Sequence, residues 1–333
     1  MNLDGYYKAH TTLALLDASG ITGRVLARGV DALDLLHRLS TNDLRPLFNS
    51  PGKGAQTILT TEKARIIDLL TVIATANGAL LVTSKDHEQS VISWLDKFTI
   101  MEDAKFTAVS NDISHFMVFG PRALEFLTSA TSVDLISLQQ FDSVELQLAS
   151  IPIRLQKTAR IIESGFSIYC DSTDHDALLA IMTEQLSEFG GAIIDEDTYE
   201  TVRIEAGISK APNELNDKHN PLETALVQAV SFTKGCYTGQ EVIARLDTYD
   251  KVQRHLMGVR CRAEVSSSLP IVCYGADGTT IGEITSLTIS PILGVSIGIA
   301  FIKTAFANPN SLITVGDEHL PATLINLPFE IES

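Results

Sequence analysis

One cysteine of the sequence lies in a setting that could make it a nucleophile. Cys236 follows Lys234 and Gly235 in the stretch FTKGCYTGQEVIARLD. Thr238 and Glu241 have the spacing of a capping box, which predicts a helix with Thr238 as its N-cap. The Lys234 cation and the positive end of that helix would both favour a thiolate. Cys236 is therefore a candidate reactive thiol; the alternative is a small buried side chain packed under the turn.

The segment after this cysteine would place its charges on a helix. Val242, Ile243 and Leu246 follow at helical spacing, and Glu241 and Arg245 are one turn apart and able to pair. The basic residues in and around this segment are Lys234, Arg245, Lys251, Arg254, Arg260 and Arg262. They could form an anion clamp, or they could pair with neighbouring carboxylates on a solvated helix.

The overall composition argues against several classes of function. The chain has 333 residues, of which 41 are acidic and 25 basic, giving a net charge of −16. Binding to nucleic acid or anionic membranes needs a basic surface instead. The sequence predicts no signal peptide, and its most apolar run, ILGVSIGIAFI, is too short to span a bilayer. The four cysteines form no C-x-x-C pair and the eight histidines show no metal-ligand spacing, so we expect a cytoplasmic protein with reduced thiols and no metal centre.

The elements that must position these residues are of mixed type. Residues 31–48 open with helical spacing, and residues 86–100 read as an amphipathic helix. Residues 57–84 read as two or three strands with a hairpin turn at Asn77-Gly78. Residues 115–129 read as a strand, a turn through Gly-Pro and a helix. The pattern predicts an α+β fold.

From residue 254 onward the helical spacing disappears. Short apolar segments alternate with turn residues, which predicts a small all-β barrel or sandwich over 254–333. We therefore expect an α+β region over 1–253, in two subdomains with the second centred on 141–190, followed by a β domain.

Several segments together resemble the folate-binding proteins of the YgfZ type. These proteins are relatives of the glycine cleavage T-protein (aminomethyltransferase) and support the maturation of iron–sulfur proteins. The most specific match is KGCYTGQEVIARLDTYDKVQRHLMGV, which begins at Lys234. Weaker matches in the same order are VDALDLLHRLSTNDLRPL, LTTEKARIIDLLTVI, VFGPRA, VRIEAGI, NPLETAL and IGEITSLTISPILGVSIGIAFI. Together the matches cover most of the chain.

The resemblance implies a fold, a ligand and a set of site residues. T-protein-like α+β domains would surround a central folate-binding opening, and a C-terminal β-barrel would follow. The cofactor would be tetrahydrofolate, bound by Asp68, Glu205, Lys234, Gly235, Gln240 and Arg245. Glu205 would accept the pterin edge, whereas its alternative role is a surface glutamate paired with Arg203 or Lys210. Asp68 would face the reactive nitrogens, and Cys236 would be the working thiol.

Departures from the T-protein favour the cysteine-bearing branch. The T-protein often has paired acidic residues where this chain has Asp68 followed by Leu69, and its turn typically has an acidic residue in place of Cys236. A glycine is also usual at the position of Ala64. The leading hypothesis is a tetrahydrofolate-binding accessory protein that acts with iron–sulfur client or assembly proteins. The alternatives are a folate-dependent transferase of the aminomethyltransferase type, and an interaction scaffold that kept the fold but lost the pocket.

Overall fold

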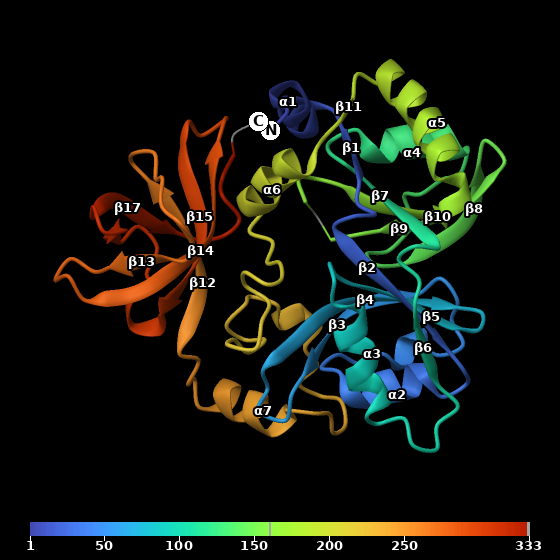
Figure 1. The fold of residues 1–333 in the computed structure, drawn as a ribbon, viewed down its shortest axis with the longest axis horizontal. Helices are drawn as coiled ribbons and strands as arrows, with labels where there is room; N and C mark the ends of the chain where they lie inside the picture. Colours follow the sequence, from blue (N-terminus) through green and yellow to red (C-terminus); the bar gives the residue numbers. More distant parts are fainter. Residues whose placement is uncertain (160, 332–333) are drawn as a thin grey trace. The chain divides into compact units, whose positions relative to one another are not determined.

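The computed structural model describes residues 1–159 and 161–331, and the chain divides into two compact units. The first unit comprises Met1–Thr198 and Gln228–Gln240, and the second comprises Tyr199–Val227 and Glu241–Ser333. Figure 1 shows the elements of both units with the labels used below.

A five-stranded sheet forms one half of the first unit, in the order β3-β4-β5-β2-β6. Its strands are β2 (Thr22–Arg28), β3 (Gly54–Thr60), β4 (Ile66–Thr75), β5 (Gly78–Ser84) and β6 (Lys105–Ala108). Two helices, α2 (Ala32–Leu39) and α3 (Glu88–Asp96), lie against one face (Figure 1) and share an apolar core with it. Thr75 pairs with Gly78, so the predicted hairpin is confirmed, but its two loop residues are Ala76 and Asn77, one position before the predicted Asn77-Gly78.

A six-stranded sheet forms the other half of this unit, in the order β11-β1-β7-β10-β9-β8. Its strands are β1 (Ala14–Asp17), β7 (Ile113–Phe119), β8 (Ser143–Leu148), β9 (Ile151–Lys157), β10 (Gly165–Asp171) and β11 (Ala192–Ile193). The accompanying helices are α1 (Leu3–Thr11), α4 (Ala123–Thr131) and α5 (His175–Glu188). Phe126 of α4 and Met182 of α5 share a buried core with Phe116 and Ile168 of the sheet. The predicted α+β class is confirmed.

The predicted all-β barrel is also confirmed, as a closed barrel in the order β12-β15-β14-β13-β16-β17. Its strands are β12 (Arg254–Cys261), β13 (Ile271–Tyr274), β14 (Thr280–Ser290), β15 (Val295–Lys303), β16 (Leu312–Val315) and β17 (Leu320–Ile325). Seven consecutive residues of β15 are buried, which explains the apolar run in the sequence. Closure leaves no unpaired strand edge.

The remaining helical segments correct two predictions about the cysteine motif. They are α6 (Glu196–Glu205), α7 (Gln240–Thr248) and the 3₁₀ turns η1 (Arg45–Leu47), η2 (Ser172–Asp174), η3 (Val227–Ala229) and η4 (Thr304–Phe306). Thr238 is not the N-cap, because α7 begins at Gln240 and Gly239 precedes it with φ +84°. The apolar segment ALVQAVSF also predicts a helix or strand before Lys234, but the structure has the short turn η3 there.

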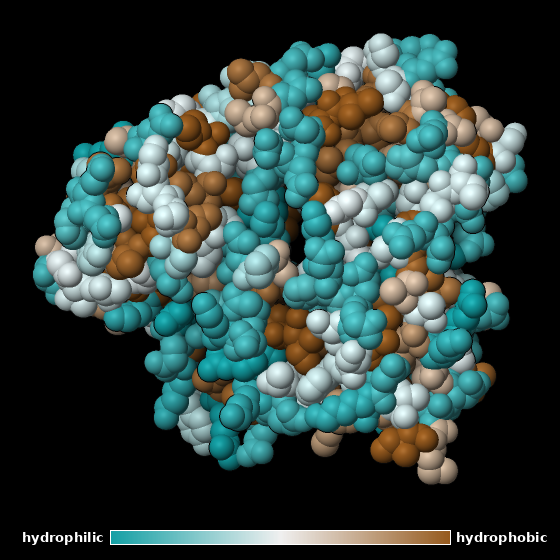
Figure 2. All heavy atoms as spheres, in the orientation of Figure 1, coloured by the Kyte–Doolittle hydropathy of each residue, from teal (hydrophilic) through white to brown (hydrophobic). Residues whose placement is uncertain are grey.

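Apolar residues also appear on the surface of the barrel. At the left of Figure 2 they lie between hydrophilic residues, and Val272, Ile289 and Leu312 are among the exposed ones. Apolar atoms normally make up a large part of a folded surface, so single exposed residues of this kind need no functional explanation. None of the helices in the described part of the chain has the length and apolar character needed to cross a membrane.

Candidate functional site

Cys236 is the accessible thiol of the protein. The chain has four free cysteines, of which Cys170, Cys261 and Cys273 are buried and Cys236 is exposed. Burial raises the pKa of Cys170 and of Cys261 to about 11, and that of Cys273 to about 12. Of these four thiols, Cys236 is therefore the one that a reagent or partner in solution can reach. We call residues 229–240, which include Cys236, the cysteine loop.

The Lys234 side chain turns away from solvent and fastens this loop to the end of α2. Its ammonium donates to the carbonyl of His37 and to the carbonyls of Ser40 and Asn42, the latter two at 2.8 Å each. The residue is 5% exposed, and burial lowers the pKa of Lys234 to about 8. Three carbonyl acceptors use all three ammonium protons, so none is left for Cys236 or for an anionic ligand in this arrangement.

Threonines from two distant segments hold the loop at further points. Thr41 accepts from the amide of Ser231 through its carbonyl (2.9 Å) and donates from its hydroxyl to the carbonyl of Ala229 (2.6 Å). The Thr60 hydroxyl donates to the carbonyl of Thr238 (2.7 Å). The segments STND (40–43) and TTEKA (60–64), which are far from the cysteine loop in the sequence, thus both contact it in the structure.

At Gly239 the backbone of the cysteine loop comes close to the backbone of residues 61–64. A Cβ at this position would lie 2.7 Å from the carbonyl oxygen of Thr61 and 3.1 Å from the Cα of Ala64. Its φ of +84° also favours glycine. Ala64 is itself buried with φ +57°, a conformation that a glycine would adopt without strain.

Asp68 lies inside the first unit. It pairs with Leu59 of β3, and it shares its side of β4 with Leu70 in the core beneath α2 and α3. Because side chains alternate along a strand, Leu69 faces the opposite side. The face opposite the helices therefore carries a leucine where the T-protein pattern often has its second acid.

The Asp68 carboxylate is satisfied by its own neighbours. Its oxygens accept from the Ser84 amide at 2.9 Å and the Ser84 hydroxyl at 2.6 Å, and the side chain is fully buried. His87 Nδ1 lies 3.5 Å from Asp68 Oδ1, and this carboxylate raises the pKa of His87. The predicted contact between Asp68 and folate stays a prediction, but here the side chain supports the β5–α3 connection.

The other predicted ligand residues near the cysteine have varied settings. Gln240 Nε2 donates to the Lys234 carbonyl at 3.4 Å, and the space beside Gly235 is open. The predicted pairing of Arg245 with Glu241 is confirmed at 2.6 Å. The structure thus favours local pairing over an anion clamp for this arginine, and folate contacts of these residues stay predictions.

In the second unit, Glu205 ends α6 and is only 2% exposed. The alternative role as a surface glutamate is therefore wrong. Arg203 and Lys210, its expected partners in that role, each form an ion pair with Glu200, at 2.6 and 2.8 Å. A buried carboxylate agrees with the predicted ligand role, which stays a prediction.

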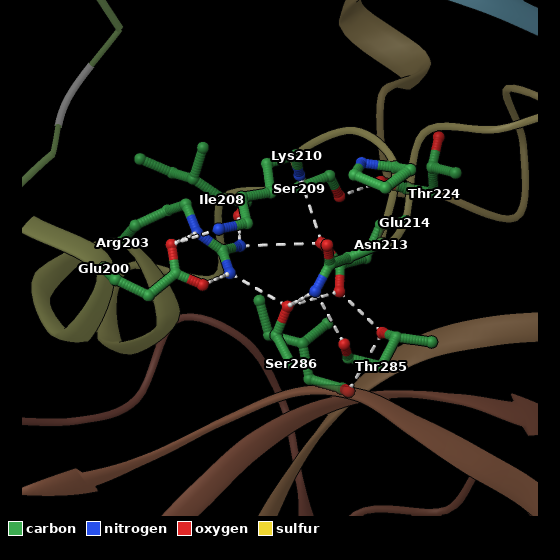
Figure 3. A network of polar contacts seen from close by, with 12 residues as sticks. Glu200, Arg203, Ile208, Ser209, Lys210, Asn213, Glu214, Thr224, Thr285 and Ser286 are labelled. Atoms are coloured by element: carbon green, nitrogen blue, oxygen red, sulfur yellow. Dashed lines mark hydrogen bonds and ion pairs between the residues drawn. The ribbon is translucent and has the colours of Figure 1, made fainter. Parts of the chain in front are cut away.

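Figure 3 shows a polar network beside this helix that the sequence did not indicate. Arg203 Nη1 lies 3.5 Å from Glu214, and its Nη2 donates to the Ser286 hydroxyl at 2.8 Å. The fully buried Glu214 also accepts from the hydroxyls of Thr285 (2.5 Å) and Ser286 (2.8 Å) and from the amide of Lys210 (3.1 Å). The network joins α6 and the following loop to strand β14.

A pocket of about 420 Å³ opens elsewhere in the first unit. Its lining includes Leu33, Leu47, Phe48, Asp34 and Asp103, and none of the predicted site residues. No cluster of metal-ligating side chains occurs among residues 1–159 and 161–331.

Comparisons with known proteins decide the family. Residues 5–234 match the model of the GCVT N-terminal domain, and residues 254–329 match the glycine cleavage T-protein C-terminal barrel domain. The chain belongs to the glycine cleavage T-protein family. Proteins of this family bind tetrahydrofolate.

Individual relatives of this T-protein family member agree with the assignment. A putative chloroplastic transferase of Arabidopsis thaliana, At1g60990, is 28% identical over 89% of this chain and 67% of its own length. An aminomethyltransferase of Listeria monocytogenes is 29% identical over 96% of this chain and 87% of its own. The crystal structure of aminomethyltransferase T from Bartonella henselae shares the fold, with a TM-score of 0.85, 19% identity and coverage of 98% and 89% of the two chains.

Proposed function

We propose that this protein is a YgfZ-type member of the T-protein family. It binds tetrahydrofolate and supports the assembly or repair of iron–sulfur proteins through the thiol of Cys236. The observation that carries this proposal is the setting of Cys236, an exposed thiol on a loop that is fastened on both sides. A fastened loop keeps the thiol at a defined place where a cluster, a sulfur atom or the cysteine of a client can reach it.

The setting of Asp68 argues against one-carbon transfer as the main activity. A general acid or base must come within hydrogen-bond reach of the reacting atoms. Asp68 is buried against Ser84 and His87, and the neighbouring position is Leu69. We therefore prefer the thiol-based function, although listerial and other relatives are named aminomethyltransferases.

An exposed, unpaired thiol also bears on where the protein works. Reducing compartments keep such thiols free, whereas oxidising compartments convert them to disulfides. The proposed function therefore belongs in a reducing compartment, and the cytoplasm meets this condition.

Cys236→Ser is expected to abolish the support of iron–sulfur enzymes in cells that lack the endogenous protein. The hydroxyl cannot replace a thiolate as a ligand or nucleophile. The affinity of the purified variant for tetrahydrofolate is expected to stay within about twofold of the wild type, because the thiol is not among the proposed folate contacts. The measurements are aconitase-type enzyme activity in cell extracts and a folate titration.

Thr233→Ser is the matched control, because Thr233 is an exposed residue of the same loop. It is expected to give full support. Full support by Cys236→Ser would show that the thiol is not used. Production of methylenetetrahydrofolate from an aminomethyl donor by the wild type would favour the transferase function instead.

A further inference from the structure

We propose that Lys234 is a positioning residue that fixes the place of Cys236, and that it does not bind the glutamate tail of folate. This inference rests on the proposed function in one respect, the use of the Cys236 thiol. The cation of the Lys-Gly-Cys motif would then serve the loop itself rather than the ligand.

The end of α2 provides the acceptors that Lys234 meets. The last carbonyls of a helix have no partner within the helix, and a cation is favoured there. The amide of Thr41, which a longer helix would direct at His37, donates instead to the carbonyl of Ile58 at 3.0 Å. The His37 carbonyl is thus available and accepts from Lys234.

The same three contacts leave Lys234 unsuited to hold an anion. To bind the Lys234 ammonium, a ligand carboxylate would have to displace one of its three acceptors, the carbonyls of His37, Ser40 and Asn42. The abandoned carbonyl would then lie without a donor in a largely buried place, which is unfavourable. The ammonium is also 5.2 Å from the Tyr237 ring centre, so an aromatic side chain contacts it from within the loop.

Two anchors enclose the thiol. Lys234 holds the loop two residues before Cys236, and the bond from Thr60 to the Thr238 carbonyl holds it two residues after. Between them, a Cβ at Gly235 would meet no other atom within 4 Å, so the space on that side of the backbone is open. Loss of the Lys234 contacts should therefore free the thiol-bearing arc on one side.

Lys234→Met tests this role because methionine is unbranched and only one heavy atom shorter than lysine, but has no hydrogen-bond donors. Amide hydrogen exchange across residues 229–240 of the full chain is expected to become at least about tenfold faster, as expected when charged hydrogen bonds of a loop are lost. Support of iron–sulfur enzymes in cells should fall. The ratio of the affinities for triglutamyl and monoglutamyl tetrahydrofolate should stay within about twofold, which separates positioning from anion binding.

Lys303→Met is the matched control. Lys303 also donates to a backbone carbonyl, that of Thr280, but it lies at the end of a barrel strand. It should leave exchange in the cysteine loop unchanged. If Lys234→Met does not fold, Lys234→Arg serves, because a planar guanidinium keeps the charge but cannot meet three converging carbonyls in the same way; faster loop exchange is again expected.

Unchanged exchange in the loop, with a tenfold or greater loss of the preference for the longer glutamate tail, would overturn the proposal. Absence of folate binding in the wild type would instead refute the proposed function, and the exchange measurement would still decide the role of Lys234. Faster exchange with full cellular support would show that Lys234 does not position a working thiol, which also overturns the proposal.

Discussion

Arg203→Met is expected to lower the free energy of unfolding by about 3–5 kcal/mol, the usual cost of leaving one partner of a buried ion pair alone. Arg203 is 2% exposed, and Glu214 is fully buried beside it. The substitution would also remove the donors to the Ser286 hydroxyl and the Ile208 carbonyl. The measurement is urea denaturation of the full chain, followed by circular dichroism.

Arg38→Met is the control for the removal of an arginine that is less buried. Arg38 pairs with Asp34 and Glu102, but its side chain is 46% exposed, so the expected loss is at most about 1 kcal/mol. Equal losses in the two variants would contradict the importance given to the network in Figure 3.

Gly239→Ala is expected to destabilise the protein by roughly 2–5 kcal/mol. A left-handed conformation costs a residue with a Cβ about 1–2 kcal/mol, and overpacking adds a cost of about 1–3 kcal/mol. Here the new atom would meet the Thr61 carbonyl at 2.7 Å, and backbone cannot move aside as a side chain can. Urea denaturation measures the loss, and hydrogen exchange shows whether the cysteine loop loosens.

Ala64→Gly changes the other side of the contact with Gly239 and is expected to have the opposite effect on stability. Because Ala64 already has φ +57°, glycine should stabilise the fold by up to about 1 kcal/mol. A neutral Gly239→Ala variant would show that the close packing of the cysteine loop on residues 60–64 contributes nothing measurable.

Local patterns account for what the sequence predicted correctly. The hairpin between β4 and β5, the pairing of Glu241 with Arg245 and the strands of the barrel depend on neighbours in the sequence, so spacing was enough to find them. The exposure of Cys236 also agrees with its motif.

Long-range contacts explain what the sequence could not show. The acceptors of the Lys234 ammonium lie 192–197 residues away, and Glu214 meets its barrel partners 71 and 72 residues away. No spacing rule connects such positions. Lys234 therefore looked like a cation next to a thiol, and Glu214 had no signal at all.

Backbone details account for the remaining differences. Thr238 has the residue type of an N-cap, but the left-handed Gly239 delays the start of α7 to Gln240. A carboxylate within a strand can face either side of the sheet, and local spacing does not say which. In the structure Asp68 lies on the same side of β4 as Leu70, which belongs to the core under the helices.

The most direct test of the account is a calorimetric titration of the full chain with tetrahydrofolate under anaerobic conditions, with Glu205→Ala beside the wild type. We expect saturable binding by the wild type. Losing a hydrogen bond to a charged group costs about 1.5–3 kcal/mol, so Glu205→Ala should bind roughly ten to a hundred times more weakly. Glu264→Ala, which removes an exposed glutamate from the second unit, should bind like the wild type. No binding by the wild type, or equal affinity in Glu205→Ala, would contradict the account.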